Sequence, residues 1–356
     1  MLIFSNTEIE EMITMTSCME ILEEMYRDFA KDAALFMSRV DNLMPTVTKD
    51  AYYAFKTMGG GWPRKSVVAL RINSDIITHP NIDGHKRRVK KPLAQGRWVG
   101  LVQLYSTETG TLLAIFPDGV VQRLRVGATN GLGLKYMAGK DAARAGLIGS
   151  GWQAGGQLLA LLAVRPIQQV KVFSPTRKHR EAFVSEMRDR TGLKIIAVDD
   201  AEACAEDVDI LMAATSSIER VIEPQWIKPG MHLSCIKSQE VDETVFDRCD
   251  RVVMHTKIQG KQTDNILPGT PKIPAAHLQG WWQKEATAPD RYPDLTDLVS
   301  GRESGRNDKD EVTCFVNNIG LGLQFAAVGS LILEKARESG IGNELPDEWF
   351  TESVHP

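Results

Sequence analysis

The chain has 356 residues, of which 43% are hydrophobic and 25% charged, and its formal net charge is −4 at pH 7. This composition is typical of a soluble globular protein of about two domains, and it gives no reason to expect nucleic acid or a membrane as a partner. No apolar run approaches the ~20 residues needed to cross a bilayer, and the first residues do not resemble a secretion signal. Five scattered cysteines and seven dispersed histidines predict reduced thiols, a cytoplasmic location and no metal site.

The N-terminal segment is predicted to be helical. Residues 7–10 (TEIE) and 17–20 (SCME) both fit the S/T-x-x-E capping box at the start of a helix. After the second box, apolar residues recur at helical spacing and predict a buried face. These residues are Ile21, Leu22, Met25, Tyr26 and Phe29.

Between about residues 40 and 116 the pattern changes to short strands. The expected strands are 52–56, 66–72, 98–105 and 112–116. Turn signals at 58–63 (MGGGWP) and 107–110 (TETG) separate them, so we expect a separate, largely antiparallel sheet. After a predicted turn at 81–84, residues 86–91 form a basic loop, which reads either as a solvated hairpin or as a contact for an acidic substrate.

A glycine-rich turn at Gly149-Ser150-Gly151-Trp152-Gln153-Ala154 follows an apolar run and opens a predicted helix. Gly149 permits the tight turn, Gly151 lets the backbone approach a pyrophosphate, and Ala154 takes the small position where the helix packs on the strand. The amides at the start of the helix then face the anion. This order predicts a dinucleotide-binding site.

Further strands alternate with helices after this turn. The expected strands are 170–173, 193–198, 209–214, 231–236 and 251–255, with helices at 179–191 and 201–207 between them. The alternation predicts an α/β protein with a Rossmann-type, doubly wound parallel sheet. We expect this sheet, residues 126–309, to be inserted into a second α+β domain for substrate binding and dimerisation, built from residues 1–125 and 310–356.

The end of the second strand bears on the choice of cofactor. NAD-selective folds usually place a carboxylate about 20 residues after the glycines, to bind the ribose 2′-hydroxyl. Here the chain reads Ser174-Pro175-Thr176-Arg177-Lys178. Hydroxyls from Ser174 and Thr176 with the cation of Arg177 suit a 2′-phosphate, so NADP(H) is favoured and NAD(H) is the alternative.

The remaining C-terminal part begins with an irregular stretch at 259–307, which contains Trp281 and Trp282 and is expected to cover an interface or an edge. A long apolar helix is expected at 317–339, ended by Gly340.

Several short motifs, in this order and spacing, resemble the ornithine cyclodeaminase/mu-crystallin family over nearly the full length. They are Leu43-Met44-Pro45, Phe55-Lys56, the 107–110 turn, Arg125-Val126-Gly127-Ala128, the glycine turn, Ala213-Ala214-Thr215-Ser216, Glu240-Val241-Asp242, and Gly301-Arg302 to Gly305-Arg306. The resemblance implies a homodimer, an active site facing the nicotinamide, and chemistry through an α-imino acid with a hydride at its α-carbon. Family members include cyclodeaminases, alanine dehydrogenase, imine reductases and a hormone-binding crystallin, and fold alone does not choose among them.

The resemblance also implies roles for single residues. Arg39, Lys56 and Arg125 match carboxylate-binding positions, and a cationic clamp suits an amino or imino acid. Arg71 is an alternative to Lys56 at its position. Thr215, Ser216 and Asn318 match positions beside the cofactor, although Asn317-Asn318 departs from the small polar residue usual there.

One departure from the family concerns the loop after the fifth expected strand, where cyclodeaminases carry a glycine and an aspartate that handles the substrate amine. Here the loop reads Ser234-Cys235-Ile236-Lys237-Ser238-Gln239-Glu240, and Lys237 stands nearest to the missing aspartate. A cation there would repel an ornithine ammonium by about 1–4 kcal/mol. Lys237 could instead donate a proton, bind a second carboxylate or the cofactor, or only cap a helix.

The leading hypothesis is an NAD(P)-dependent oxidoreductase for an α-imino or α-amino acid, with Lys56, Arg125 and Lys237 as the catalytic candidates. The alternatives are a cyclodeaminase-like ammonia lyase and an NADPH-dependent small-molecule binding protein. The expected partners are a small amino or imino acid and a second copy of the chain.

Overall fold

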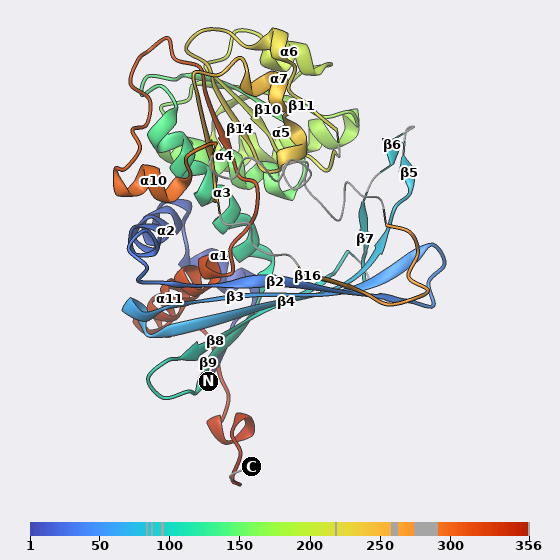
Figure 1. Cartoon of the computed structure of the whole chain (residues 1–356), viewed down its shortest axis with the longest axis vertical. Helices are drawn as coiled ribbons and strands as arrows, with labels where there is room; N and C mark the ends of the chain where they lie inside the picture. The colour runs from blue at the N-terminus through green and yellow to red at the C-terminus, as the bar shows by residue number, and fades with distance from the viewer. Residues whose placement is uncertain are drawn as a thin grey trace. The chain divides into compact units, whose positions relative to one another are not determined.

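The computed structural model describes residues 1–82, 85–86, 88–93, 96–217, 219–257, 263–273 and 291–354. The chain divides into two compact units (Figure 1). Unit 1 comprises Met1–Arg125, Gln259–Pro274 and Leu321–Pro356, and unit 2 comprises Val126–Ile258 and Ala275–Gly320. The fold class is the one predicted: an α/β protein with an all-parallel sheet in one unit and a mixed sheet in the other.

The helices and strands of unit 1 come from both ends of the chain. Its strands are β1 (Leu2–Ile3), β2 (Leu35–Pro45), β3 (Ala51–Trp62), β4 (Val67–Thr78), β5 (Asn81–Ile82), β6 (His85–Lys86), β7 (Val89–Lys91), β8 (Val99–Ser106), β9 (Leu112–Pro117), β16 (Thr263–Ile266) and β18 (Asn343–Glu344). Its helices are α1 (Asn6–Met12), α2 (Met15–Phe29), α11 (Leu323–Ser339) and the short η1 (Pro63–Lys65) and η4 (Asp347–Phe350).

The main sheet of unit 1 has the strand order β16-β2-β3-β4-β8-β9-β1-β18, and β7 pairs with the far end of β4. It is mostly antiparallel, as predicted, but β1 runs parallel to β9 and β16 runs parallel to β2. Alternate residues of β4 are buried along its whole length, which gives the sheet one inner face. Helix α11 packs on β3, β4 and β8 and also contacts α2.

The glycines at 59–61 lie within a strand, so the turn expected at 58–63 is wrong. Residues 51–62 form one long strand, β3, paired with β4 from Ala51↔Thr78 to Trp62↔Val67. A β-carbon added to Gly60 would lie 2.5 Å from the Cα of Leu323, at the start of α11. The absent side chains therefore let a helix lie directly on the strand.

Both N-terminal capping boxes are present but begin at other residues than those predicted. Helix α1 is capped by Ser5, which exchanges hydrogen bonds with Glu8, and α2 is capped by Thr14 with Ser17. Ser17 therefore lies inside the first turn of α2. The predicted apolar face is correct, since Ile21, Leu22, Met25 and Tyr26 are buried.

Helix α3 (Asp118–Met137) was not anticipated, and the division between the units falls within it, after Arg125. The strands of unit 2 are β10 (Arg144–Ile148), β11 (Gln169–Phe173), β12 (Lys194–Ala197), β13 (Ile210–Ala213), β14 (His232–Cys235), β15 (Arg251–Met254) and β17 (Thr313–Val316). Its other helices are α4 (Trp152–Val164), α5 (Arg177–Thr191), α6 (Ala201–Ala205), α7 (Glu243–Phe246), α10 (Leu295–Ser300), η2 (Pro224–Trp226) and η3 (Ser238–Glu240).

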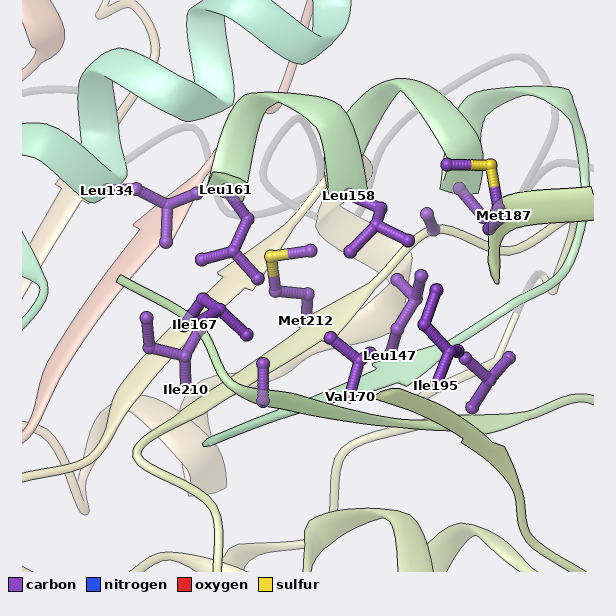
Figure 2. Close-up of a cluster of buried hydrophobic side chains, with 14 of the residues drawn as sticks. Leu134, Leu147, Leu158, Leu161, Ile167, Val170, Met187, Ile195, Ile210 and Met212 are labelled. Atoms are coloured by element: carbon purple, nitrogen blue, oxygen red, sulfur yellow. The ribbon is translucent and has the colours of Figure 1, made fainter. Parts of the chain in front are cut away.

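The seven strands of unit 2 are all parallel, in the order β12-β11-β10-β13-β14-β17-β15. Both faces of this sheet are buried. On one face, Leu147, Val170 and Met212 pack against Leu158 and Leu161 of α4 (Figure 2). On the other, Leu211, Leu233 and Cys314 belong to a second apolar cluster with Val245 and Phe246. A sheet covered on both faces explains the nearly continuous apolar runs of its strands.

Two segments lie in a different unit from the one expected. Residues 310–320 were assigned to the substrate domain, but β17 inserts between β14 and β15 and makes a seventh strand where six were predicted. Residues 263–266 were assigned to the dinucleotide domain, but β16 pairs with β2. The expected helix at 317–339 begins only at Leu323, and Gly340 ends it in a left-handed conformation (φ 68°), as predicted.

The predicted tryptophan pair, Trp281 and Trp282, lies outside the described residues. The same holds for Arg87 of the basic loop. Within the part that the structure covers, no helix is both long enough and apolar enough to cross a bilayer.

The contact at Gly60 predicts a large effect from a single methyl group. Gly60→Ala would push α11 away from β3, because the nearest atoms are backbone atoms of Leu323, and we expect a loss of about 1–3 kcal/mol in the free energy of unfolding. Denaturant unfolding measures this. Gly119→Ala in α3, whose added β-carbon meets no atom closer than 3.5 Å, is the control. Equal stability of the two variants would contradict the close packing.

Candidate functional site

The turn after β10 has the geometry of an anion-binding turn. Gly149 has φ 127°, and an added β-carbon would lie 2.2 Å from the carbonyl oxygen of Ala214. Gly151 caps α4 with extended backbone (φ −90°, ψ −176°) and without a side-chain hydrogen bond. A β-carbon there would meet no described atom within 4 Å. The first amides of α4, from Trp152 and Gln153, thus begin a helix at an open position, which suits a phosphate group.

The strands beside this turn place the predicted ribose contacts together. The hydroxyls of Ser150 and Ser174 lie 2.8 Å apart and link the ends of β10 and β11. Thr176 caps α5 without using its side chain. The side chain of Arg177 is 78% exposed and pairs with Glu181 at 2.8 Å.

A second cation at this corner, Arg180, was not predicted. Its side chain is buried, donates to the carbonyl oxygen of Ser174 at 3.2 Å, and pairs with Asp199. Arg180 follows Thr176 by one helical turn, and this spacing in the sequence could have identified it as a second cation near the end of β11.

The loops after β13 and β14 are joined by one buried carboxylate. Glu240 accepts from the amide and the hydroxyl of Thr215 at 2.6 and 2.8 Å, and from the amides of Ile236 and Lys237 at 2.9 and 3.1 Å. Burial raises the pKa of Glu240, while Lys237 and the donated hydrogen bonds act in the opposite direction. Glu240 was noted only as part of a motif. Its role here is to hold together two loops at the carboxyl ends of neighbouring strands.

Lys237 and Asn318 are engaged with backbone groups. The amine of Lys237 donates to the carbonyl oxygen of Ser217 at 2.5 Å. The side-chain amide of Asn318 exchanges hydrogen bonds with the backbone of Thr256, at 3.1 and 3.3 Å. Ser216, in the loop after β13, is exposed. The predicted residues of unit 2 therefore all lie in segments that follow the carboxyl ends of its strands, where ligands bind in open α/β sheets.

Unit 1 carries three of the other predicted residues, Arg39, Lys56 and Arg71, on its sheet, and Arg125 on α3. Asp41 on β2 lies opposite Lys56 on β3, and Lys56 lies opposite Asn73 on β4. Arg39 donates two hydrogen bonds to the carboxylate of Asp41, at 2.6 and 2.7 Å. The amine of Lys56 lies 3.7 Å from the same carboxylate. Asp41 was not predicted, and its carboxylate offsets the positive charges of the buried Lys56 and the half-buried Arg39.

Arg71 and Arg125 both lie near one aromatic ring. Their guanidinium carbons are 5.6 and 5.2 Å from the centre of the Phe325 ring. Arg71 pairs with Asp118 at 2.6 Å, and Asn73 donates to the same carboxylate.

Arg125 donates to the side-chain oxygens of Gln122 and Gln324, at 2.7 Å each. Gln324, itself fully buried, donates in turn to the hydroxyl of Tyr26. Neither glutamine was predicted.

Burial and neighbouring charges change the acidity of two of these cations. Burial, followed by the positive charges of Arg88 and Arg39, holds the pKa of Lys56 well below its usual range, although Asp41 and Asp75 oppose this effect. Burial and the charge of Arg71 lower the pKa of Arg125 to about 9. A lysine with a lowered pKa gives up its proton more readily than an ordinary lysine, as a catalytic acid must.

Among the residues that the structure describes, no group of His, Cys, Asp and Glu side chains is arranged to hold a metal ion. The arrangement instead offers an anion-binding turn in unit 2 and a buried cationic face in unit 1.

The chain is similar to known proteins over nearly its whole length. Residues 1–340 match the model of the ornithine cyclodeaminase/mu-crystallin family. Alanine dehydrogenase of Archaeoglobus fulgidus is 27% identical over 350 residues, covering 97% of this chain and 98% of that protein.

Two solved structures share the fold. One is Δ1-pyrroline-2-carboxylate reductase of Thermococcus litoralis in complex with NADH and L-proline, with a TM-score of 0.77, 23% identity, and coverage of 97% of this chain and 100% of that chain. The other is an archaeal alanine dehydrogenase dimer with bound NAD, with a TM-score of 0.77, 24% identity, and coverage of 97% and 98%. The family match spans both units, and the chain therefore belongs to the ornithine cyclodeaminase/mu-crystallin family.

Proposed function

We propose that the protein is an NAD(P)-dependent oxidoreductase acting on an α-imino or α-amino acid. Unit 2 is the dinucleotide-binding domain and unit 1 is the substrate-binding and dimerisation domain. The observation that carries the proposal is the turn from Gly149 to Gly151, which opens α4 beside the point where the strand order of the parallel sheet reverses, between β10 and β13. The names of the relatives, an alanine dehydrogenase and a pyrroline-carboxylate reductase, support the same class of reaction. The homodimer rests on the archaeal relative.

The residues around the turn fit a dinucleotide. Gly149, Ser150, Gly151, Trp152 and Gln153 would hold the pyrophosphate through backbone amides, and the position above Gly151 is open. Thr215, Ser216 and Asn318 would lie along the nicotinamide half. When bound, the cofactor supplies or accepts the hydride at the substrate α-carbon.

The residues of unit 1 would bind the substrate and move its proton. Arg125, oriented by Gln122 and Gln324, would hold the α-carboxylate together with Lys56. Arg39 already pairs with Asp41, and Arg71 with Asp118. They are therefore not assigned to direct binding of the substrate, and their role is to add positive charge beside it. Lys56, with its lowered pKa, would deliver a proton to the imine nitrogen or remove one from the amine. Lys237 is bound to Ser217 and is assigned to the cofactor loop rather than to proton transfer.

A reductase or dehydrogenase is favoured over a cyclodeaminase by the loop after β14. The glycine and aspartate that handle the substrate amine in cyclodeaminases are missing, and Glu240 is fully occupied in binding loop amides. The pure binding protein is disfavoured by the acidity of Lys56, because a buried lysine with a strongly lowered pKa is typical of proton-transfer sites.

The proposal is tested at Gly151. Gly151→Asp places a carboxylate where the pyrophosphate should lie, and the extended backbone accepts any residue. Like charges about 4 Å apart repel by about 1–4 kcal/mol, so we expect NADH and NADPH affinity to fall about 10- to 1,000-fold in calorimetry. Gly151→Asn is the neutral control, and thermal unfolding checks the fold. Unchanged affinity in the aspartate variant, or no coenzyme binding by the unaltered protein, would refute the proposal.

We further propose that NADP(H) is the preferred cofactor, since residues 174–178 contain no carboxylate and Arg177 is exposed beside Ser174 and Thr176. Arg177→Gln should lower affinity for NADPH about tenfold and leave NADH affinity little changed, because only NADPH carries the 2′-phosphate. Calorimetry with both coenzymes measures the ratio. The control is Lys194→Gln. Lys194 begins β12 and lies at the amino ends of the parallel strands, whereas Ser174 to Lys178 follow the carboxyl end of β11. A protein that binds NADH more tightly than NADPH would show that the alternative is correct.

The role of Lys56 predicts a pH dependence. In the reductive direction the protonated amine is the acid, so kcat/KM should fall as pH rises through a pKa well below the usual lysine value. Burial lowers this pKa most, Arg88 and Arg39 lower it further, and Asp41 and Asp75 oppose the shift. Lys56→Met should remove this limb of the profile and lower kcat by at least about 100-fold. The exposed Lys49→Met variant should keep both the pH dependence and the kcat of the unaltered protein. A Lys56→Met pH profile identical to that of the unaltered protein would exclude Lys56 as the proton donor.

A further inference from the structure

Phe325 is an apolar residue in the first turn of α11 that contacts two buried cations. Its side chain is fully buried. The guanidinium carbon of Arg125 lies 5.2 Å from the centre of its ring, and that of Arg71 lies 5.6 Å from it. A cation within about 6 Å of an aromatic ring is attracted by the negative charge of the ring face, and this attraction is strongest where water is excluded. The ring is therefore placed to hold both guanidinium groups.

The other contacts of these two arginines differ in charge. Arg71 forms an ion pair with Asp118 at 2.6 Å. Arg125 donates hydrogen bonds to the side-chain oxygens of Gln122 and Gln324, at 2.7 Å each. These two amides and the ring orient the guanidinium of Arg125 and bring no negative charge to it. Such contacts suit a guanidinium whose partner is to be the carboxylate of a ligand.

The place of the ring is fixed by the close contact between α11 and the strand β3. Gly322, at the start of α11, lies so near this strand that an added β-carbon would be 2.2 Å from the carbonyl oxygen of Gly59. The same strand carries Lys56, the second residue that we assign to the substrate α-carboxylate. The contact between helix and strand therefore sets the position of the ring relative to Lys56.

We propose that Phe325 is a positioning residue for the substrate, whose ring holds the charged guanidinium of Arg125 where it binds the α-carboxylate. This inference rests on the proposed function and deepens it, because it names a residue that sets the affinity for the carboxylate through another side chain. A cation–π contact changes an equilibrium constant by about 2- to 30-fold, depending on how far the pair is desolvated. Weakening the ring face should change the affinity for the carboxylate by a factor in this range.

The experiment weakens the negative face of the ring and keeps its shape. Phe325 is replaced in turn by mono-, di- and trifluorinated phenylalanine through nonsense suppression. Each fluorine withdraws electron density from the ring face and adds little volume, so the attraction for a cation falls step by step.

The probes are L-alanine, which carries the α-carboxylate beside a small side chain, and L-alaninamide, its counterpart without the carboxylate charge. Calorimetry of the coenzyme-loaded protein gives the dissociation constant of each. We expect the preference for L-alanine over L-alaninamide to fall with each added fluorine, by about 2- to 30-fold over the series. Coenzyme affinity should stay the same.

The matched control is the same fluorinated series at Phe116. Phe116 is also buried in unit 1 and lies close to Gly329 of α11, but its ring contact is with Phe4, at 6.4 Å between the ring centres. Fluorination there should leave the preference for L-alanine unchanged. Thermal unfolding is measured for both series, because a purely structural role of Phe325 predicts altered stability with an unaltered preference.

Phe325→Leu is a simpler second variant, which keeps an apolar side chain and removes the ring. In the reduction of an imino acid it should raise KM about 2- to 30-fold and change kcat much less, because the carboxylate contact is made both before and during the reaction. A fall in kcat with an unchanged KM would contradict the positioning role.

The outcomes separate this inference from the proposed function. A preference that stays constant along the Phe325 series, or that falls equally in the Phe116 series, would overturn the inference. Equal affinities for L-alanine and L-alaninamide in the unaltered protein would also overturn it. If an imino acid is reduced and the Phe325 series has no effect, this inference alone fails. If the series behaves as expected but no imino acid is reduced, the carboxylate site stands and the oxidoreductase proposal alone fails.

Discussion

The buried charges of unit 1 constrain the structure more than any other feature. Three strands bring Asp41, Lys56 and Asn73 into register on one face, where water is largely excluded. A one-residue slip of any strand would turn its polar side chains to the opposite face and leave their partners buried without compensation. The ion pairs of Arg39 and Arg71 therefore depend on the same register that places Lys56 and Arg125.

Unit 2 meets a different requirement, which is to hold flexible connections still at one edge of a sheet. Glu240 joins the loops after β13 and β14, Asn318 joins those after β15 and β17, and Ser150 joins the turn to Ser174. Each link uses a side chain to satisfy backbone groups or a neighbouring hydroxyl. Such support lets loops present backbone amides in a defined geometry, as binding sites require.

The parts of the fold that depend on local chemistry were predictable from the sequence. The turn at Gly149 and Gly151 combines a rare backbone requirement with a following helix, and Gly340 ends α11 for a similar local reason. The all-parallel sheet followed from the alternation of apolar runs with helices. The cationic residues Lys56 and Arg125 were proposed by resemblance; Lys56 lies on the sheet beside Asp41 and Arg39, whereas Arg125 lies on α3 beside Phe325.

The parts that depend on distant residues were not predictable. The glycines at 59–61 suggested a turn because the helix that lies on them, α11, begins more than 250 residues later. Strand β17 was missed because its partners, β14 and β15, precede it by about 60 to 80 residues. Asp41, Asp118 and Gln324 carry no local signal, since their role is to satisfy cations on other elements.

The contact between Gly60 and Leu323 also affects the order in which the units can form during synthesis. Most of unit 2 is one continuous stretch, and its last strand, β17, is synthesised before α11. The sheet of unit 1 must wait for α11 to cover Gly60 and for Gln324 and Phe325 to reach Arg125. Until then the apolar part of that sheet is exposed, and such a half-covered sheet is a typical site for chaperone binding or misassembly.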